Sequence, residues 1–217
     1  TLGTYLLAKV AYDRSGGNPL FTPVMLAAAL LIALLKLTGT AYETYFDGAQ
    51  FVHFLLGPAT VALAVPLFEN LGRVRKALLP MVAALVAGSA TAVVSAMVIA
   101  RLLGASRESV VSLAPKSVTT PIAMAIAEGL GGIPSLTAAL VLITGVIGAV
   151  LAPPLFAVLK VKDHRATGFA LGLCAHGIGT ARAFQMHELA GTFSGIAMAV
   201  NGLLTAVMVP LVATWLR

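Results

Sequence analysis

Long runs of apolar residues dominate the chain, and short charged stretches separate them. Three runs, 77–100, 133–159 and 189–216, contain no charged residue. Each is longer than the ~20 residues that an α-helix needs to cross ~30 Å of hydrocarbon. The pattern therefore predicts membrane-spanning helices.

In all, the pattern predicts eight membrane segments, at about 2–13, 20–38, 49–70, 76–103, 108–131, 133–160, 166–187 and 189–216. The third, fifth and seventh contain helix-breaking residues, namely Pro58, Pro66, Pro115, Pro121, Gly172, Gly177 and Gly179. A break frees backbone N–H and C=O groups, which are tolerated at membrane depth only against protein or water. We therefore predict an all-α, polytopic transmembrane helical bundle with discontinuous or re-entrant helices.

A short internal repeat suggests how the bundle is organised. Residues 69–72, after the Pro58 segment, read ENLG, and residues 128–131, after the Pro115 segment, read EGLG. Corresponding broken segments in two halves are typical of transporters built from repeats. We predict a single integral-membrane domain, 1–217, with an inverted repeat of halves at about 1–104 and 105–217. The first segment is short, and we expect it to be a helix that lacks its beginning.

Composition supports the membrane assignment. The chain is 59% hydrophobic and 10% charged, whereas a soluble domain carries about 25% charged residues. The net charge of +6 comes from basic residues scattered between the apolar segments, so they are interpreted as interfacial anchors and not as a nucleic-acid surface. The single cysteine, Cys174, excludes an internal disulfide, and we expect it to be a small packing residue.

The loop charges predict the topology. Basic clusters follow the first, third and sixth segments, and they comprise Lys9, Arg14, Arg73, Arg75, Lys76, Lys160, Lys162 and Arg165. If all three clusters are cytoplasmic, an even number of crossings separates Lys76 from Lys160. Segments four to six would make three crossings if each of them spanned the membrane, so one of them must fail to cross. The broken stretch 109–130 is the candidate for a re-entrant hairpin that enters and leaves on one side. Arg101 and Arg107 then lie outside, which weakens the scheme.

The stretch 115–121, PKSVTTP, is the strongest candidate for a site. A lysine at membrane depth costs at least ~2.5–3.5 kcal/mol and normally lines a water-filled or protein-lined cavity. Freed amides, the hydroxyls of Ser117, Thr119 and Thr120, and the Lys116 ammonium together suit a small carboxylate. The alternative is that Lys116 extends to the interface and the hydroxyls bond their own helix.

A second candidate is the stretch 176–182, HGIGTAR. His176 can change protonation near neutral pH, Thr180 would share its helix face, and Arg182 can bind a carboxylate with two parallel hydrogen bonds. The alternative is a packed histidine, with Arg182 at the membrane surface near Gln185. Asn201, halfway along the last apolar run, can bond either the substrate or a facing helix.

Enzyme classes find no support in the sequence. It contains no HExxH, GxSxG, Walker or dinucleotide-binding motif, and its acidic residues lie mostly at segment ends. We therefore predict no enzyme activity, no cofactor and no metal site.

Four strings together resemble the LrgB/CidB family: GPATVALAVP at 57–66, PKSVTTPIA at 115–123, GGIP at 131–134 and HGIGTAR at 176–182. The resemblance runs from about residue 6 to the C-terminus. It implies a multi-pass protein of the bacterial inner membrane, paired with a small LrgA/CidA-type membrane protein. It also implies the broken-helix, inverted-repeat architecture of cation/proton antiporters and bile-acid symporters.

The family resemblance leaves two functions open. Relatives are linked to pyruvate uptake, and the plant chloroplast member exchanges glycolate and glycerate, which implies proton-coupled secondary transport of a small monocarboxylate. In that hypothesis Lys116 and Arg182 neutralise the carboxylate, Ser117, Thr119, Thr120, Thr180 and Asn201 bond its oxygens, and His176 couples a proton. The alternative is a non-transporting, antiholin-like regulator of murein hydrolases and autolysis. A homo-oligomer is compatible with both.

Overall fold

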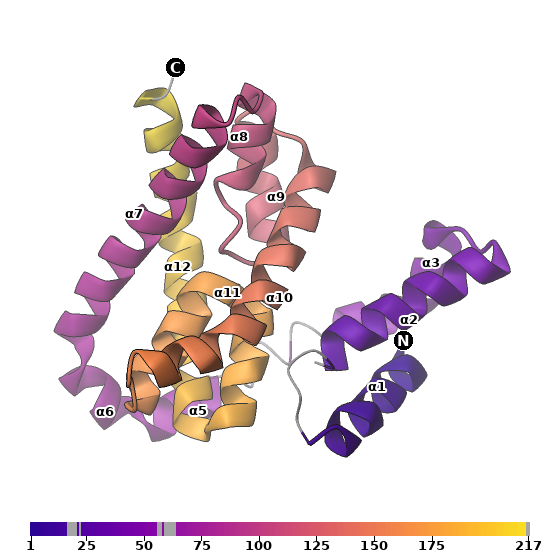
Figure 1. The fold of residues 1–217 in the computed structure, drawn as a ribbon, viewed down its shortest axis with the longest axis horizontal. Coiled ribbons are helices and arrows are strands. Elements are labelled where there is room, and N and C mark those ends of the chain that lie inside the picture. The colour runs from indigo at the N-terminus through magenta and orange to yellow at the C-terminus, as the bar shows by residue number, and fades with distance from the viewer. Residues whose placement is uncertain (17–20, 22, 56–57, 59–63, 216–217) are drawn as a thin grey trace. The chain divides into compact units, whose positions relative to one another are not determined.

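The computed structural model describes residues 1–16, 21, 23–55, 58 and 64–215, which form two compact units, Thr1–Val65 and Pro66–Arg217. The ordered elements of the described residues are helices, so the prediction of an all-α membrane bundle is confirmed (Figure 1). The first unit contains α1 (Leu2–Arg14), α2 (Pro23–Thr38) and α3 (Tyr42–Phe54), and α1 packs on α2. The helix α5 (Ala64–Glu69) begins where this unit ends.

Three helices in the described part of the second unit are long and apolar enough to cross a membrane. They are α7 (Leu78–Leu102), α10 (Pro134–Val158) and most of α12 (Glu188–Trp215). The short helix α6 (Leu71–Lys76) precedes them. The predicted segments 108–131 and 166–187 are broken helices. The predicted segment 49–70 falls partly on 56–57 and 59–63, outside the described residues.

The predicted break in the fifth segment folds the chain back on itself. α8 (Arg107–Leu113) ends at a turn, Pro115 is fully buried in that turn, and α9 (Thr120–Gly129) starts with Pro121 in its first turn. The Ser112 hydroxyl accepts a hydrogen bond from the backbone N–H of Ile133, at 2.7 Å, so α8 lies beside the chain that leaves α9. We call 107–132 the first hairpin and 114–119 its tip.

The seventh segment forms a second hairpin, which the sequence did not predict. Helical geometry in α11 (His164–Met186) is lost at Ala175 and at His176, where φ is 42° and ψ is −132°. At the outer ends of the two arms, the imidazole rings of His164 and His187 stack with centroids 4.1 Å apart. The chain therefore returns to the end at which it started, and residues 175–176 form the second tip.

The two hairpins enter the second unit from opposite ends (Figure 1). The beginning of α7 packs on the second hairpin, where Met81 and Leu85 join a core with Phe169 and Leu173. The end of α7 packs on the first hairpin, through a core that contains Val93, Met97, Ala100, Val110, Ala114 and Val209. Because α7 and α10 each cross between these ends, the basic residues before α7 and after α10 lie on one side, as the loop charges predict.

Close approach of α12 to the second hairpin requires glycine at two positions. A Cβ on Gly168 would lie 2.0 Å from the carbonyl oxygen of Ala190, and one on Gly172 would lie 2.0 Å from that of Ser194. Both obstacles are backbone atoms, so a side-chain rotation cannot relieve them. The interruption that Gly172 suggests in the sequence is therefore a point of helix contact.

We predict that Gly172→Ala lowers the melting temperature of the detergent-solubilised protein by roughly 5 °C or more, because overpacking costs ~1–3 kcal/mol even where side chains yield. Gly195→Ala is the matched control, since a Cβ there meets no atom within 4 Å. Equal melting temperatures for the two variants, measured by tryptophan fluorescence or differential scanning fluorimetry, would contradict this packing.

Candidate functional site

The tips of the two hairpins meet at Asn201, in the middle of α12. The Asn201 Nδ2 group donates to the carbonyl oxygen of Leu173, at 3.0 Å, and to that of Ser117, at 3.5 Å. Leu173 precedes the second tip and Ser117 lies in the first. One amide therefore binds freed carbonyl groups from both hairpins.

The other end of the same amide is bound as well. Asn201 Oδ1 accepts from the hydroxyls of Ser89, at 2.5 Å, and Thr205, at 3.3 Å, and Asn201 is 1% exposed. In this conformation the Asn201 side chain links α7, α12 and both hairpins through hydrogen bonds. Ser89 was missed at the sequence level, although a serine inside the uncharged run 77–100 is the kind of signal that marks a helix contact.

Lys116 lies in the first tip and points at the middle of α7. Its Nζ group donates to the carbonyl oxygen of Ala92, at 3.0 Å, and the residue is half-buried. Ala92 is ten residues from Leu102, or roughly 15 Å from the nearer end of α7. The ammonium is thus held at depth and does not extend to the interface.

Three residues with hydroxyl side chains follow Lys116 closely in the chain. Ser117 is buried, and Thr119 and Thr120 are half-buried at the start of α9. Thr119 is the N-cap residue of α9, but its side chain makes no capping hydrogen bond. Within the described residues neither threonine hydroxyl has a hydrogen bond to a protein group, so both are available to a ligand, while a shared site of Lys116, Thr119 and Thr120 stays a prediction.

The second tip is fixed by His176 and Thr180. His176 Nε2 lies 3.0 Å from the carbonyl oxygen of Val141 and, since a carbonyl only accepts, carries the proton there. The Thr180 hydroxyl bonds the His176 carbonyl oxygen, at 2.9 Å, and the Ser194 hydroxyl, at 3.0 Å. Both side chains are buried in protein contacts. Val141 also packs on Val118 of the first tip, so α10 supports both tips.

Arg182 lies on the second arm of α11, beyond the tip. Its guanidinium donates to Gln185 Oε1, at 3.2 Å, and the residue is half-buried. Six residues separate it from His176, which is about 9 Å along a helix. This contact with Gln185 is the alternative arrangement that the sequence allows, and the convergence of Lys116 and Arg182 on one pocket stays a prediction.

The predicted helix-breaking residues take different places. Pro115 lies in the first tip and Pro121 starts α9, whereas Gly177 directly follows the non-helical His176. Gly179 lies in the second arm, where a Cβ would come 2.5 Å from the carbonyl oxygen of Leu171 on the first arm. Pro66 lies within α5, and Pro58 borders residues outside the described part of the chain.

A groove of about 470 Å³ follows the first arm of α11 along α7. Cys174, next to the second tip, lines it and is exposed, so the expectation that this cysteine is a packing residue was wrong. Sequence alone gives no signal for this position, because exposure here depends on how α11 is rotated against α7.

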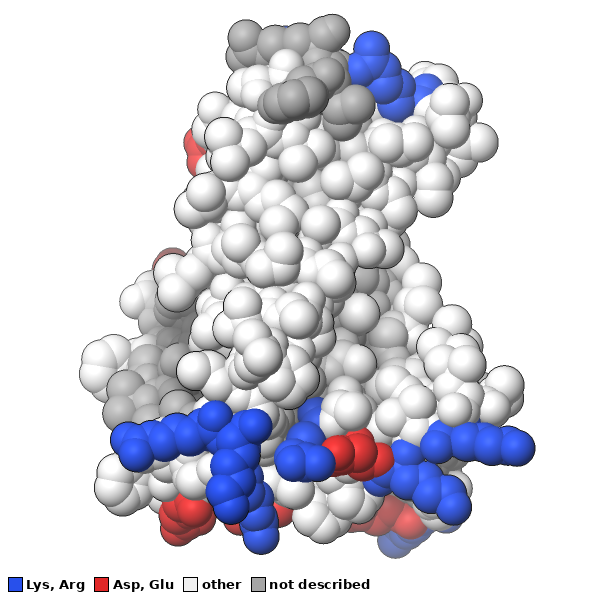
Figure 2. Space-filling model, turned by 90° about the vertical axis from the view of Figure 1, so that its left-hand side faces the viewer, with Lys and Arg blue, Asp and Glu red and all other residues white. Residues whose placement is uncertain are grey.

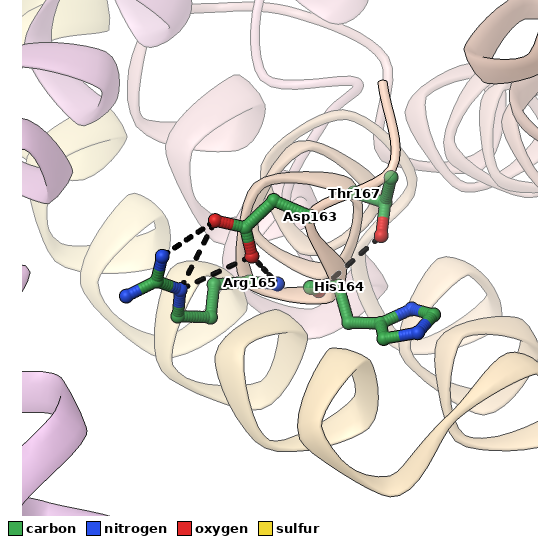
Figure 3. A network of polar contacts seen from close by, with 4 residues as sticks. All are labelled: Asp163, His164, Arg165 and Thr167. Carbon is green, nitrogen blue, oxygen red and sulfur yellow. Dashed lines mark hydrogen bonds and ion pairs between the residues drawn. The ribbon is translucent and has the colours of Figure 1, made fainter. Parts of the chain in front are cut away.

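The other end of the groove carries charge. Lys76, Asp163 and Arg165 line it there, at the end of the second unit where lysine and arginine side chains gather below an uncharged surface (Figure 2). Asp163 caps α11 by accepting from the Arg165 backbone N–H, at 2.8 Å, and its carboxylate faces the Arg165 guanidinium, at 2.6 Å, while His164 points away (Figure 3). The hydrogen bonds from Arg165 lower the pKa of Asp163, so this ion pair persists at neutral pH.

A second cavity, of about 540 Å³, lies at the opposite end of the unit. Arg101 and Arg107 line it together with apolar residues that include Met97 and Val111. The two arginines that the sequence places outside therefore lie at the end away from Lys76. Among the described residues no cluster of histidine, cysteine and acidic side chains could hold a metal ion.

Comparison with known proteins gives one consistent result. The model of the LrgB-like family matches residues 1–215. Protein YxaC of Bacillus subtilis is 35% identical over 216 residues, covering 100% of this chain and 93% of YxaC. The antiholin-like protein LrgB of Bacillus mycoides is 33% identical over 211 residues, covering 97% of this chain and 92% of that protein. No solved structure matches.

We predict that Asn201→Ala destabilises the protein by about 1–3 kcal/mol, because it leaves buried carbonyl groups in both tips without a donor. The melting temperature in detergent should fall by several degrees. Thr91→Ala is the control, since the Thr91 hydroxyl bonds only the Ala87 carbonyl of its own helix and is exposed. An Asn201→Ala melting temperature equal to that of the control would show that the amide does not hold the tips.

Proposed function

Since this chain belongs to the LrgB-like family, we propose that this membrane protein is a secondary carrier for a small monocarboxylate of the pyruvate, glycolate or glycerate type. The observation that carries the proposal is the half-buried Lys116 ammonium, which the first hairpin tip holds against the Ala92 carbonyl oxygen of α7, about 15 Å from the end of that helix. An ionisable group kept at membrane depth marks a functional site, and discontinuous helices are the usual framework for it.

The chemistry of the tip suits one negative charge. A lysine ammonium has three N–H donors, and Lys116 uses one of them on Ala92. The hydroxyls of Thr119 and Thr120 and the first amides of α9 lie in the same stretch of chain, where a carboxylate is favoured by the helix dipole. One lysine neutralises one carboxylate, which favours a monoanion over a dicarboxylate.

Proton coupling is proposed for His176. Its Nε2–H is bound to Val141, so Nδ1 is the atom at which a second proton would be taken up. Protonation would add a positive charge beside the carboxylate site, and this links proton and anion movement. Arg182, Thr180 and Asn201 remain proposed contacts of the substrate in a conformation other than this one, because here they bind protein groups.

The lipid bilayer and an LrgA/CidA-type membrane protein are the proposed surroundings, with the multi-pass chain in the bacterial inner membrane. The name of the Bacillus mycoides relative favours a second candidate function, an antiholin-like regulator that acts through its partner without transport. This candidate predicts that partner binding and lysis phenotypes survive the loss of Lys116, so the two functions can be separated.

We predict that Lys116→Gln lowers the uptake of labelled pyruvate, glycolate or glycerate into proteoliposomes by about 10- to 100-fold. A charge-assisted hydrogen bond is worth ~1.5–3 kcal/mol, and 1.4 kcal/mol is a factor of ten. Lys162→Gln, in the exposed link between α10 and α11, should transport as the unmodified protein does.

Arg182→Gln in the same uptake assay decides whether that arginine contacts the substrate. Full uptake by the folded Lys116→Gln protein would reject the proposed site. If that variant also binds an LrgA/CidA-type partner and restrains lysis normally, the regulatory function is the better one.

A further inference from the structure

We propose that the groove between α7 and the first arm of α11 is the path by which the anion reaches the hairpin tips from the Lys76 end. Small organic carboxylates are its occupants, which rests on the proposed function. Cys174 lies at the inner end of this path, directly before the second tip in the chain. The protein in this conformation is therefore open toward the side that carries Lys76.

The volume of the groove is large enough to hold a small anion. At ~30 Å³ per molecule in liquid water, about 470 Å³ holds roughly 15 waters. The lining begins with Lys76 and Ala77, directly before α7, and continues past Met81 and Ala84 to Gly88. The residues from Met81 to Gly88 cover about two turns of α7, so the groove runs along the helix and not across it.

The inner end of the groove reaches the tips. Leu173 and Cys174 line the groove, and the Leu173 carbonyl oxygen is the one bound by Asn201. The same Asn201 amide binds the carbonyl oxygen of Ser117, the residue that follows Lys116 in the first tip. An anion that moves along the groove therefore arrives where the two hairpins meet.

Charge at the mouth is complementary to an anion. Arg165 is offset by Asp163, with which it forms an ion pair at 2.6 Å. Lys76 is the further charged residue in the groove lining, so the mouth carries a net charge of +1 from Lys76, Arg165 and Asp163. A net positive charge at the mouth raises the rate at which anions arrive relative to cations.

Cys174 gives a direct test because it is the single cysteine of the chain. We expect membrane-impermeant methanethiosulfonate reagents to modify it in vesicles, from one side, with the anionic reagent reacting about 10-fold faster than the cationic one. Lys162→Cys in a Cys174→Ser background marks the side of the α10–α11 link, and Cys174 should react from that side.

A lipid-facing control separates the groove from the bilayer. Val86→Cys in the Cys174→Ser background places a thiol on the exposed apolar surface of α7 and should stay unmodified. Lack of reaction at Cys174 from either side, as expected if lipid chains fill the groove, would overturn the proposal. Equal rates with both reagents, or reaction from the side opposite to the marker, would overturn it as well.

Two variants at the mouth should act in opposite directions on the ratio of anionic to cationic labelling rates at Cys174. Lys76→Gln should lower the ratio several-fold, and Asp163→Asn should raise it, because asparagine keeps a helix cap but releases Arg165 from its partner. If neither variant changes the ratio, charge at the mouth does not guide anions and the proposal fails.

The labelling experiment needs no substrate, so its outcome does not depend on the proposed function. Side-specific, charge-selective labelling without any uptake of carboxylates would support the groove as an anion path and reject the carrier function. Uptake that depends on Lys116 while Cys174 is unreactive would support the carrier function and reject this path. Protection of Cys174 by millimolar pyruvate would support both.

Discussion

Backbone polar groups that are released inside an apolar bundle must find partners, and the second unit depends on how this is done. Both hairpins end in non-helical residues inside the unit, which leaves carbonyl groups without intrahelical donors. Asn201 supplies both of its N–H donors to these groups, one to each tip. The Asn201 amide thereby fixes the depth of both tips and their position against α7 and α12.

The polar side chains of the tips complete the same arrangement. Lys116 bonds a carbonyl of α7, and His176 bonds one of α10. The long helices α7 and α10 thus each present a carbonyl group to a tip, and α12 presents the Asn201 amide to both. On α10, a Cβ at Gly145 would lie 2.7 Å from the His176 ring, so a larger residue there would displace the histidine. Polar contacts at the centre and close packing along the arms together hold two broken helices in place.

Sequence patterns predicted the long helices and the first hairpin for a plain physical reason. An uncharged run of more than 20 residues has few alternatives in lipid, and Pro115 and Pro121 cannot continue a helix without loss of hydrogen bonds. The charge pattern then required one segment not to cross. The second hairpin was not predicted because its two arms, 164–174 and 177–186, together have the length of one membrane-spanning helix. In addition, the residue with positive φ is His176 and not the neighbouring glycine.

The composition of the site was less accessible to sequence reasoning than its location. The contact of Lys116 with Ala92 depends on how the first tip packs against α7, and the contact of Arg182 with Gln185 depends on the side-chain conformation of Arg182, neither of which a local pattern encodes. The predicted inverted repeat, with its halves at about 1–104 and 105–217, also stays a prediction. The helix–hairpin–helix–hairpin–helix order of α7 to α12 offers another division, in which α10 lies between the two hairpins.

In the proposed carrier, the opposed hairpins would give a physical route to alternating access. A carrier needs a barrier on each side of its substrate, and the two hairpins reach Asn201 from opposite ends, so each could form one barrier. The groove beside α11 leads to the tips from the Lys76 end, and the cavity with Arg101 and Arg107 lies at the other end. Because Asn201 binds the two tips separately, through different N–H groups, one tip can move while the other keeps its bond. The longer contact, to Ser117 at 3.5 Å, is the weaker of the two, so the first hairpin is the one that Asn201 releases more readily.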